Sequence, residues 1–379
     1  MATHYWSPHR GGIETVAREQ CERLVQRGHE VRVITSRLRG DSPELRDGAI
    51  DVRRVSVWNP LERRGIPYPV FSPRLVAEAR EALRWADVAL VHGHTFLPSA
   101  VIARLARPLG VPVVALQHNT FIEYGPPWEN VQRAADALLG GPTLARADRL
   151  LAVSEETRAY VTAMLPGAAV EVLHNGVDPD RFTPAGAAER AAVREELGLP
   201  TGAFVVLTVR RMVRKNGIDT LLEAAEHLPT DGSMAFALCG GGPDLAGLQA
   251  TCHDRGWQHV RMPGFVSDDA LPRWYRAADV FVLPSRSGEG FPMAVLEALA
   301  SGVPVIATRA GGQTDVVRPG SNGWLVPPSD PGAMAAALRE AATTDLGMLG
   351  RNARASAAAL AWSRQVDRLE AVLEEVARA

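Results

Sequence analysis

Short runs of apolar, β-branched residues recur along this chain, and they constrain its fold more than any other feature. The segments VPVVAL (111–116), FVVLTV (204–209) and VPVIAT (303–308) are almost entirely apolar and do not alternate with polar residues. Strands that are buried on both faces of a parallel sheet have this pattern. Helical stretches rich in Ala, Leu and Arg separate the runs. The alternation predicts an α/β architecture with parallel sheets.

The expected elements fall into two series. The first series predicts strands at 30–35, 51–57, 87–92, 111–117, 149–154 and 170–174. The second predicts strands at 203–209, 234–240, 260–262, 279–284, 303–308 and 323–326. Helices are expected at 14–27, 74–85, 97–105, 219–227 and 333–342. Only residues 2–6 precede the first glycine pair, so the first strand is either very short or truncated.

A stretch rich in Gly, Pro and Asp at 175–184 separates the two series. We therefore expect two Rossmann-like domains facing each other across a cleft, one at 1–178 and one at 179–361. The last segment, 362–379, has apolar residues at helical spacing and predicts an amphipathic helix. Ligands of such sheets bind at the carboxyl ends of the strands.

Composition excludes several classes of protein. With 41 basic and 43 acidic residues the net charge is −2. The chain therefore lacks the bulk positive charge by which many proteins bind nucleic acid. Three cysteines without CxxC spacing predict no disulfide framework and no zinc site. No apolar run is long enough to span a membrane, and the first residues show no leader pattern. A cytoplasmic protein is expected.

The segment EGFPMAVLE (289–297) follows an expected strand and opens an expected helix. Pro292 suits the first turn of that helix, where its missing N–H costs nothing. The free backbone N–H groups at this position can hold a phosphate. Glu289 and Glu297 bracket the helix start, so their carboxylates can flank a ligand lying there. The alternative interpretation is an acidic helix N-terminus stabilised by the helix dipole.

A second polar motif, RRMVRKNG (210–217), follows the strand FVVLTV. A cation cluster on a strand-to-helix loop suits a diphosphate. Lys215 is the single lysine of a chain that has 40 arginines, which indicates a need for a compact ammonium at this position. The alternative is a solvated basic loop.

Several further residues are weaker signals. Glycine pairs or triplets follow strands at 11–12, 240–242 and 311–312. His118 ends a strand and could be a polar contact or an acid/base group in a cleft. His92 and His94 have the spacing of a metal pair but lack a third ligand, so a structural role is favoured. Asp178 and Asp180 form a DxD sequence within the interdomain stretch, where we interpret them as linker residues and expect no metal.

In combination these residues resemble the retaining, nucleotide-sugar-dependent glycosyltransferases of family 4, which have the GT-B fold. The resemblance covers nearly the whole chain. It is carried by PHRGGIE (8–14), RGHEV (27–31), His118, VSE (153–155), NGVD (175–178), the 210–217 loop, Gly240–Gly242, ADVFVLPS (278–285) and the Glu289/Glu297 motif.

The resemblance implies that the C-terminal domain binds the donor and that the N-terminal domain binds most of the acceptor. Arg210 and Lys215 match the pair that holds the donor diphosphate. Glu297 matches the carboxylate that binds the nucleotide ribose. The last helix would cross back onto the N-terminal domain.

The same resemblance places Glu289 at the hydroxyls of the transferred sugar, with Gly290, Phe291 and Pro292 beside it. It implies that His118 contacts the donor sugar. The remaining donor-binding positions that it implies are Gly12 beside the phosphate and the backbone of Phe265 and Val266 at the base.

Two departures from the family pattern affect this assignment. Members of the family usually have Gly-Arg where this chain has Arg210–Arg211, so either arginine could bind the phosphate. The spacing between Arg210 and Lys215 favours Arg210. The usual Gly-Gly-x-Pro-Glu is replaced here by GGQTD (311–315).

The expected activity is transfer of a hexosyl residue from GDP-mannose or a UDP-sugar to a hydroxyl acceptor with retention of configuration. Arg210, Lys215 and the helix-start amides would stabilise the leaving diphosphate without a metal or another cofactor. We favour attack from the face that the diphosphate leaves, with a phosphate oxygen taking the acceptor proton. His118 would then orient the sugar. The alternatives are a nucleotide-sugar epimerase on the same fold and a non-catalytic sugar-nucleotide-binding homologue.

The acceptor could be a glycan, a lipid-linked molecule or a small metabolite, and the sequence does not choose among them. Residues 1–180 hold 21 arginines and 21 acidic residues. Their one dense basic run is Arg53, Arg54, Arg63 and Arg64. We therefore expect at most weak peripheral association with the inner face of a membrane.

Overall fold

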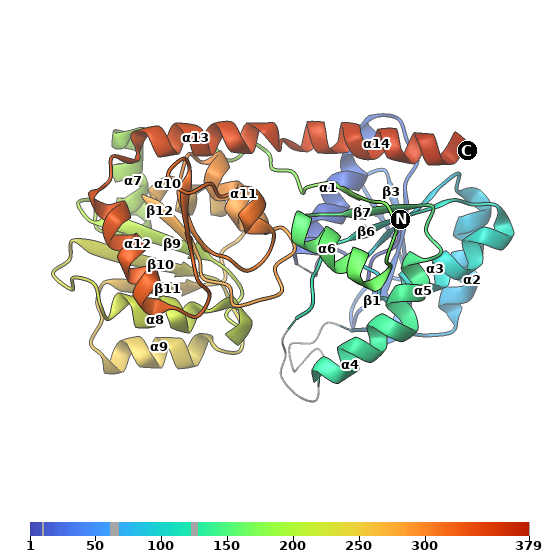
Figure 1. The fold of residues 1–379 in the computed structure, drawn as a ribbon, viewed down its shortest axis with the longest axis horizontal. Helices are drawn as coiled ribbons and strands as arrows, with labels where there is room; N and C mark the ends of the chain where they lie inside the picture. The colour runs from blue at the N-terminus through green and yellow to red at the C-terminus, as the bar shows by residue number, and fades with distance from the viewer. Residues whose placement is uncertain (10, 61–67, 123–127, 379) are drawn as a thin grey trace. The chain divides into compact units, whose positions relative to one another are not determined.

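The computed structural model describes residues 1–9, 11–60, 68–122 and 128–378. The chain divides into two compact units (Figure 1). Unit 1 comprises Met1–Asn175 together with Trp362–Ala379, and unit 2 comprises Gly176–Ala361. The expected boundary after residue 178 lies three residues beyond this division, and the last segment falls with the first unit, as expected.

Unit 1 is built on a parallel sheet. Its parallel strands are β1 (Arg32–Arg37), β3 (Ile50–Trp58), β5 (Ala89–His92), β6 (Val113–Gln117), β7 (Arg149–Ala152) and β8 (Val170–Val172). β1 pairs with β3, and β5 to β8 pair in chain order. Six predicted strands therefore form within a few residues of the expected ranges, because each is an apolar run that a parallel sheet buries.

The first strand is reduced to a few residues at the centre of this sheet. Ala2 is fully buried and forms parallel bridges to both Ile34 of β1 and Val91 of β5. Its N–H donates to the Leu90 carbonyl, and its own carbonyl accepts from the N–H of His92. Residues 1–3 thus join the two halves of the sheet, which agrees with the expectation of a very short first strand.

Two antiparallel strands were not predicted. β2 (Glu44–Asp47) and β4 (Val70–Phe71) both pair with β3. The sequence of β2 is ELRD, and its residues are alternately exposed and half-buried. An edge strand of this kind lacks the apolar run from which the other strands were predicted, so the sequence did not indicate it.

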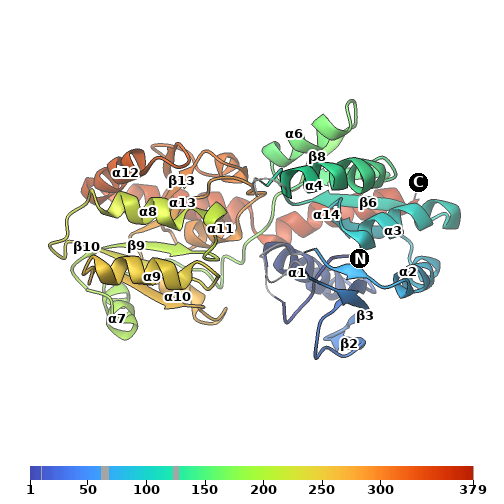
Figure 2. The same ribbon diagram turned by 90° about the horizontal axis from the view of Figure 1, so that it is seen from below.

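Helices cover both faces of the unit 1 sheet (Figure 2). They are α1 (Gly12–Gln26), α2 (Arg74–Trp85), α3 (Leu97–Ala106), α4 (Trp128–Ala135), α5 (Gly141–Leu144), α6 (Glu155–Met164) and α14 (Trp362–Arg378), with a short π-helix, η3 (Asp136–Gly140), after α4 and a 3₁₀ turn, η2 (Arg107–Leu109), after α3. Leu75, Ala79 and Leu83 of α2 pack into one core. Ala17 and Cys21 of α1 pack into a second one with Val33 of β1.

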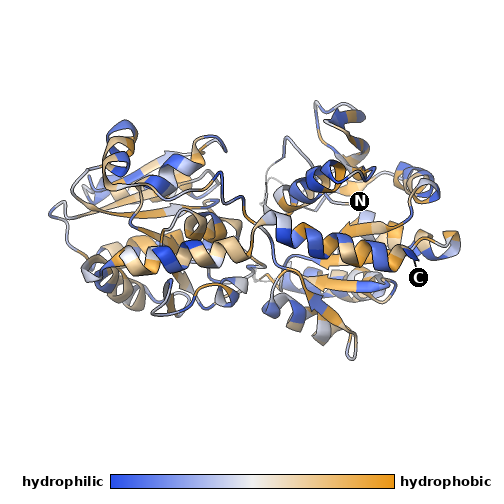
Figure 3. Ribbon diagram, turned by 90° about the horizontal axis from the view of Figure 1, so that it is seen from above, coloured by the Kyte–Doolittle hydropathy of each residue, from blue (hydrophilic) through white to orange (hydrophobic). Residues whose placement is uncertain are grey.

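Helix α14 returns to unit 1 and packs against α1. Val366 and Leu369 are fully buried, whereas the polar residues between them face solvent, and Figure 3 shows this alternation along the helix. Arg27, at the end of α1, donates to Asp367 and to Glu370, each at 2.5 Å. The predicted amphipathic stripe is therefore the face that docks on the N-terminal unit.

Unit 2 contains a six-stranded parallel sheet of order β11-β10-β9-β12-β13-β14. The strands are β9 (Phe204–Val209), β10 (Met234–Cys239), β11 (Val260–Gly264), β12 (Val280–Leu283), β13 (Val305–Thr308) and β14 (Gly323–Val326). The helices are α7 (Ala187–Leu197), α8 (Ile218–Ala225), α9 (Leu245–Asp254), α10 (Leu271–Ala277), α11 (Met293–Ala300), α12 (Pro331–Thr343) and α13 (Leu346–Ala359), with 3₁₀ turns η4 (Arg214–Asn216) and η5 (Gly312–Asp315).

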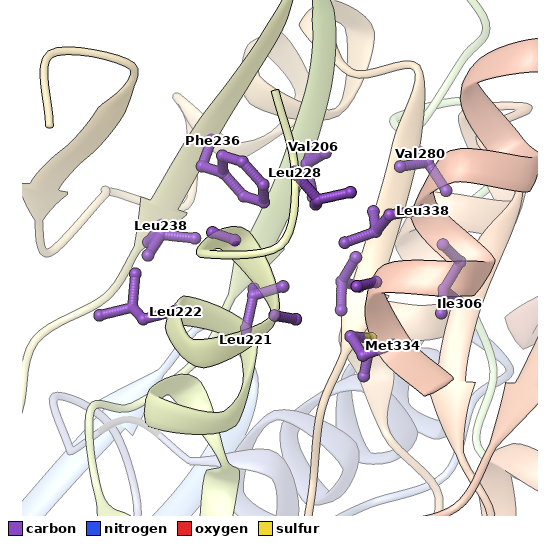
Figure 4. Packing of buried hydrophobic residues seen from close by; sticks show 14 of the residues in the cluster. Val206, Leu221, Leu222, Leu228, Phe236, Leu238, Val280, Ile306, Met334 and Leu338 are labelled. Atoms are coloured by element: carbon purple, nitrogen blue, oxygen red, sulfur yellow. The ribbon is translucent and has the colours of Figure 1, made fainter. Parts of the chain in front are cut away.

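The core of unit 2 shows why its strands read as continuous apolar runs. Figure 4 shows Val206 and Phe236 from the sheet packed with Leu221 of α8 and Leu338 of α12. All four are fully buried. At roughly 1.5–3 kcal/mol for each large apolar side chain buried, this face of the sheet contributes strongly to stability. Among the described residues, every helix is too short or too polar to cross a membrane.

Candidate functional site

Most of the predicted site residues lie along one edge of the unit 2 sheet. Because the six strands are parallel, their carboxyl ends all meet at this edge. β9 leads into the 210–217 loop, β10 into the glycines at 240–242, and β12 into the 284–292 loop. The structure thus brings together segments that are about 80 residues apart in the sequence.

Arg210 and Glu289 form a buried ion pair at the centre of this edge. Arg210 Nη2 lies 2.5 Å from Glu289 Oε1 and 2.9 Å from Asn216 Oδ1, and Nη1 donates to Ser285. The exposed fractions of the two charged side chains are 9% and 11%. Burial alone would raise the pKa of Glu289, but the Arg210 guanidinium and the Lys215 ammonium outweigh it and hold that pKa below its ordinary value.

Lys215 lies half-buried beside this pair. Burial lowers its pKa, the Glu289 carboxylate raises it, and the neighbouring Arg210 and Arg211 lower it further, so the net shift is downward. One carboxylate therefore faces two nearby cations. The excess positive charge at a water-poor edge suits a dianionic or more highly charged ligand such as a diphosphate.

The structure distinguishes the two adjacent arginines. Arg211 is exposed, whereas Arg210 is held by three side chains. Asn216 donates to the Arg211 carbonyl at 2.7 Å and so ties the loop around Arg210. This geometry favours Arg210 as the guanidinium that faces a ligand.

The start of α11 lies next to the ion pair. Gly290 and Phe291 are buried, and Pro292 is the N-cap residue with extended backbone, one position earlier than the predicted first turn. Within the described part of the chain, no side chain caps this helix end. Its first amides, together with the positive end of the helix dipole, are therefore available to an anion.

Glu297 lies one turn inside α11 and is half-buried. Its Oε2 atom accepts a hydrogen bond of 2.7 Å from the hydroxyl of Tyr275, which is fully buried on α10. Burial and the nearby Glu297 carboxylate raise the pKa of Tyr275 well above its ordinary value, so this hydroxyl remains a donor. Tyr275 thus fixes the orientation of the Glu297 carboxylate.

Two glycines allow the loops at this edge to approach one another. A Cβ atom on Gly240 would lie 1.7 Å from the Arg210 carbonyl oxygen, and one on Gly311 would lie 2.3 Å from the Glu289 carbonyl oxygen. Both have φ in the region that favours glycine, +142° and +120°. Gly311 also bridges Glu289 directly. These glycines therefore allow the backbone of the two charged residues to lie close to the neighbouring loops.

Phe265 and Val266 follow β11 at the same edge of the sheet. The Phe265 side chain is 65% exposed, and Val266 is half-buried. They lie after the strand that flanks β10, on the side of Gly240–Gly242. An exposed ring at this place offers a flat surface, and the adjacent backbone can bind the edge of a base.

His118 and Gly12 belong to unit 1. His118 follows β6 and is 5% exposed. Its Nε2 atom lies 2.8 Å from Nδ1 of the fully buried His92, which ends β5. Burial lowers the pKa of His118 to about 3. Gly12 is exposed at the start of α1, whose N-cap residue is Gly11.

The Gly11–Gly12 loop lies over a second buried carboxylate, Glu14. Its Oε1 atom lies 3.2 Å from His9 Nδ1 and 3.6 Å from His4 Nε2. Burial would raise the pKa of Glu14, but the hydrogen bond with His9 and the charge interactions with His4 and His9 lower it below its ordinary value. A Cβ atom on Gly11 would collide with this carboxylate.

Two weaker sequence signals have structural roles. His94 contacts the Gln117 side chain through Nδ1 at 2.8 Å and Asp136 through Nε2 at 3.0 Å. Asp178 Oδ1 accepts hydrogen bonds from the backbone N–H groups of Asp180 and Arg181, so it closes a turn. The favoured interpretations of both motifs agree with these contacts.

The expected basic run is only partly described. Arg53 pairs with Asp51 at 3.0 Å and with Glu44 at 2.9 Å. Arg54 is buried and donates to the Ser7 carbonyl at 2.5 Å. The side chains of both are therefore engaged within the unit. Arg63 and Arg64 lie outside the described residues, as does Arg10 of the first glycine motif.

Sequence reasoning missed the residues that orient the expected ones. Ser285 and Asn216 had a weak signal, since each stands within or next to a motif already singled out. Tyr275 had none, because it lies 22 residues from Glu297 on another helix. The sequence indicated His92 only as one residue of the His92/His94 pair, which has the spacing of metal ligands. In the structure His92 contacts His118, 26 residues away.

Two family models match the chain. Residues 10–181 match the model described as Glycosyltransferase Family 4, and residues 189–359 match the one described as Glycosyl transferases group 1. D-inositol 3-phosphate glycosyltransferase 1 of Catenulispora acidiphila is 33% identical over 96% of this chain and 90% of its own length. The GDP-mannose-dependent alpha-(1-6)-phosphatidylinositol monomannoside mannosyltransferase of Mycolicibacterium smegmatis is 33% identical over 89% and 87%.

Solved structures with low sequence identity share the fold. The sucrose-phosphate synthase of Thermosynechococcus elongatus superimposes with a TM-score of 0.80 at 23% identity, covering 96% of this chain and 93% of its own. Anabaena HepE in complex with UDP and glucose gives a TM-score of 0.76 at 20% identity, covering 98% of both chains.

Proposed function

The chain belongs to glycosyltransferase family 4 and has the GT-B fold that its motifs predicted, and from this premise we propose that it transfers a hexosyl residue from a nucleotide-diphosphate sugar to a hydroxyl acceptor with retention of configuration. The observation that carries the proposal is the cluster of Arg210, Lys215 and Glu289 beside the uncapped start of α11. Two cations and free amides can stabilise the negative charge of a departing sugar diphosphate, and the carboxylate can accept hydrogen bonds from the hydroxyls of the sugar.

The chemistry follows from the charge that develops as the donor breaks. The bond from the anomeric carbon to the diphosphate oxygen cleaves, and negative charge grows on the leaving group. Arg210, Lys215 and the first amides of α11 stabilise this charge. The acceptor oxygen bonds to the same face of the anomeric carbon, and the departing phosphate oxygen takes the acceptor proton. This route needs no metal ion.

Glu289 has a different part in this scheme. Its carboxylate is bonded to Arg210 and remains ionised, which suits it to accept hydrogen bonds from sugar hydroxyls. Glu297, oriented by Tyr275, binds the ribose. Gly290, Phe291 and Pro292 shape the wall between them, and Phe265 and Val266 meet the base. By the family resemblance, we also propose that His118 contacts the sugar and that Gly12 lies beside the phosphate.

The names of two relatives support a choice of donor and acceptor class. One is named for D-inositol 3-phosphate, and another for GDP-mannose and a phosphatidylinositol mannoside. We therefore propose GDP-mannose or a UDP-sugar as donor and a phosphorylated polyol, free or lipid-linked, as acceptor. The enzyme would act in glycan or cell-envelope synthesis in the cytoplasm.

Association with a membrane, if the acceptor is lipid-linked, is proposed to be peripheral and weak. Arg53 and Arg54 are engaged within unit 1, which reduces the charge available to anionic lipid. Sedimentation with anionic vesicles at low and at physiological salt tests this. Tight binding that survives high salt would contradict it.

The test of function is product analysis. The protein is incubated with GDP-mannose, UDP-glucose or UDP-N-acetylglucosamine, with and without inositol phosphate. A glycosylated acceptor with unchanged anomeric configuration supports the proposal. An isomerised nucleotide sugar without acceptor would indicate an epimerase, and binding without any turnover would indicate a non-catalytic homologue. Thermal-shift screening against UDP, GDP, ADP and TDP identifies the base, because a bound nucleotide raises the unfolding temperature.

A further inference from the structure

Two buried histidines in unit 1 share a hydrogen bond, although the sequence indicated a role in binding or catalysis for only one of them, His118. His92 Nδ1 lies 2.8 Å from His118 Nε2. The ring planes differ by 15°, and the ring centroids are 5.0 Å apart. The two nitrogens are in hydrogen-bond contact while the ring centroids are far apart, so the rings meet edge to edge and not face to face. The shared proton therefore lies near the lone-pair direction of the accepting ring.

Both imidazoles are neutral. His92 is fully buried and His118 is 5% exposed. Burial lowers the pKa of His118 to about 3 and that of His92 well below its ordinary value. A neutral imidazole has one N–H and one bare nitrogen. Only one of the two rings can therefore donate in this contact, and the choice determines what the other nitrogen of His118 presents.

The surroundings of His92 settle which ring donates. Its Nε2 atom is buried and has no hydrogen-bond partner among the described residues. If His118 donated, the single N–H of His92 would have to sit on that Nε2, as a buried donor without an acceptor. Orphaned buried N–H groups are rare, because a donor that leaves water without finding an acceptor keeps its full desolvation penalty. If His92 donates through Nδ1, its Nε2 keeps only a bare lone pair.

We propose that His92 is a positioning residue that donates to His118 and holds it as the Nδ1–H tautomer. In this state Nδ1 of His118 carries a proton and Nε2 accepts the hydrogen bond from His92, so neither nitrogen has a free lone pair. It can donate one hydrogen bond, through Nδ1, to an oxygen of the substrate, and it cannot act as a general base. The functional part of this inference rests on the proposed glycosyl transfer, whereas the tautomer does not.

The tautomer can be measured on the full chain without substrate. Long-range ¹H–¹⁵N correlation spectra of protein labelled with ¹⁵N-histidine distinguish a protonated ring nitrogen from a bare one. The chain has ten histidines, and the signals of this pair are assigned by their loss in His92→Asn and His118→Gln. We expect both rings to carry the proton on Nδ1. A proton on Nε2 of His118 would overturn the proposal.

Two variants of nearly equal shape test the role of the donor. His92→Asn keeps an N–H group near the position of Nδ1, whereas His92→Leu removes it. We expect His92→Leu to lower kcat roughly tenfold, the equivalent of one hydrogen bond, with little change in the KM for the donor. His118 should then shift toward the Nε2–H tautomer. His92→Asn should keep most of the kcat and the Nδ1–H tautomer.

The outcomes separate this inference from the proposed function. Equal kcat for the two variants, or an unchanged His118 tautomer in His92→Leu, would overturn the role of His92. Thermal unfolding shows whether each variant is folded, and if His92→Leu is not, the spectrum of the unaltered protein decides. A protein with the expected tautomer that transfers no sugar would contradict the proposed function alone.

Discussion

At the scale of single residues, the candidate site depends on charges held by their neighbours. Arg210 is oriented by Ser285, Asn216 and Glu289. Lys215 adds a compact ammonium where the rest of the chain uses arginine. These contacts order the site before any ligand binds, which is the preorganisation that transition-state stabilisation needs.

Lys215→Ala is expected to lower kcat/KM by about 10²-fold or more, on the order of 2–4 kcal/mol, because it removes one charge that stabilises the leaving diphosphate. Steady-state kinetics with the donor identified by thermal shift measures this. Arg214→Ala is the matched control, since its exposed side chain lies in the same loop. A Lys215→Ala enzyme with nearly normal kcat/KM would remove Lys215 from the site.

Tyr275→Phe is expected to raise the KM for the donor several-fold and to leave kcat nearly unchanged. The substitution removes only the hydroxyl that donates to Glu297, which corresponds to about 1 kcal/mol. Binding of the nucleotide alone should weaken by the same factor. A substitution of Phe182, whose ring packs edge-on against Tyr275, is the control, because it changes the packing of the Tyr275 ring and keeps the hydroxyl. An unaltered KM would show that Glu297 needs no such orientation.

At the scale of elements, the loops that follow the strands carry the candidate site residues, and helix α14 packs against α1, which is distant in the sequence. β9 and β12 each deliver a polar loop to the same edge because they are adjacent and parallel. Helix α14 buries Val366, Leu369 and Val376 against unit 1. Its ion pairs with Arg27 are partly exposed and add less than the apolar face does.

Removal of residues 363–379 is therefore expected to lower the stability of the protein by several kcal/mol, at roughly 1.5–3 kcal/mol per large buried side chain. Urea unfolding measures the loss, and catalysis should weaken more than donor binding, since unit 2 holds the donor residues. Arg378→Ala, which breaks only an exposed pair with Glu374, is the control. A truncated protein of unchanged stability would show that α14 contributes little.

At the scale of the whole molecule, two α/β units have separate sheets, and the chain passes between them twice. The two connecting segments pair with each other, since the Val177 N–H donates to the Leu360 carbonyl at 3.0 Å. The edge of the unit 2 sheet carries two cationic side chains, Arg210 and Lys215, beside the backbone amides that begin α11. The described structure therefore offers cations of its own at the place where a diphosphate would bind.

Activity is accordingly expected to persist after dialysis against EDTA. Transfer assayed with and without added Mg²⁺ or Mn²⁺ measures this directly. The double variant Asp178→Asn, Asp180→Asn serves as a control and should keep its activity, because Asp178 closes a turn. An absolute requirement for a divalent cation would contradict the proposed mechanism and would restore these aspartates as candidate ligands.

The sequence by itself determined the α/β class, nearly every parallel strand, the division into two units and the family. It could do so because buried parallel strands need apolar runs, and because loops that follow strands must meet at one edge. The edge strand β2 was missed because its sequence, ELRD, contains only one apolar residue and its residues are exposed or half-buried. Only the tertiary structure paired His92 with His118, Tyr275 with Glu297, and Arg210 with Glu289. Such contacts join residues far apart in the chain, and their specificity depends on distances and burial that no local pattern encodes.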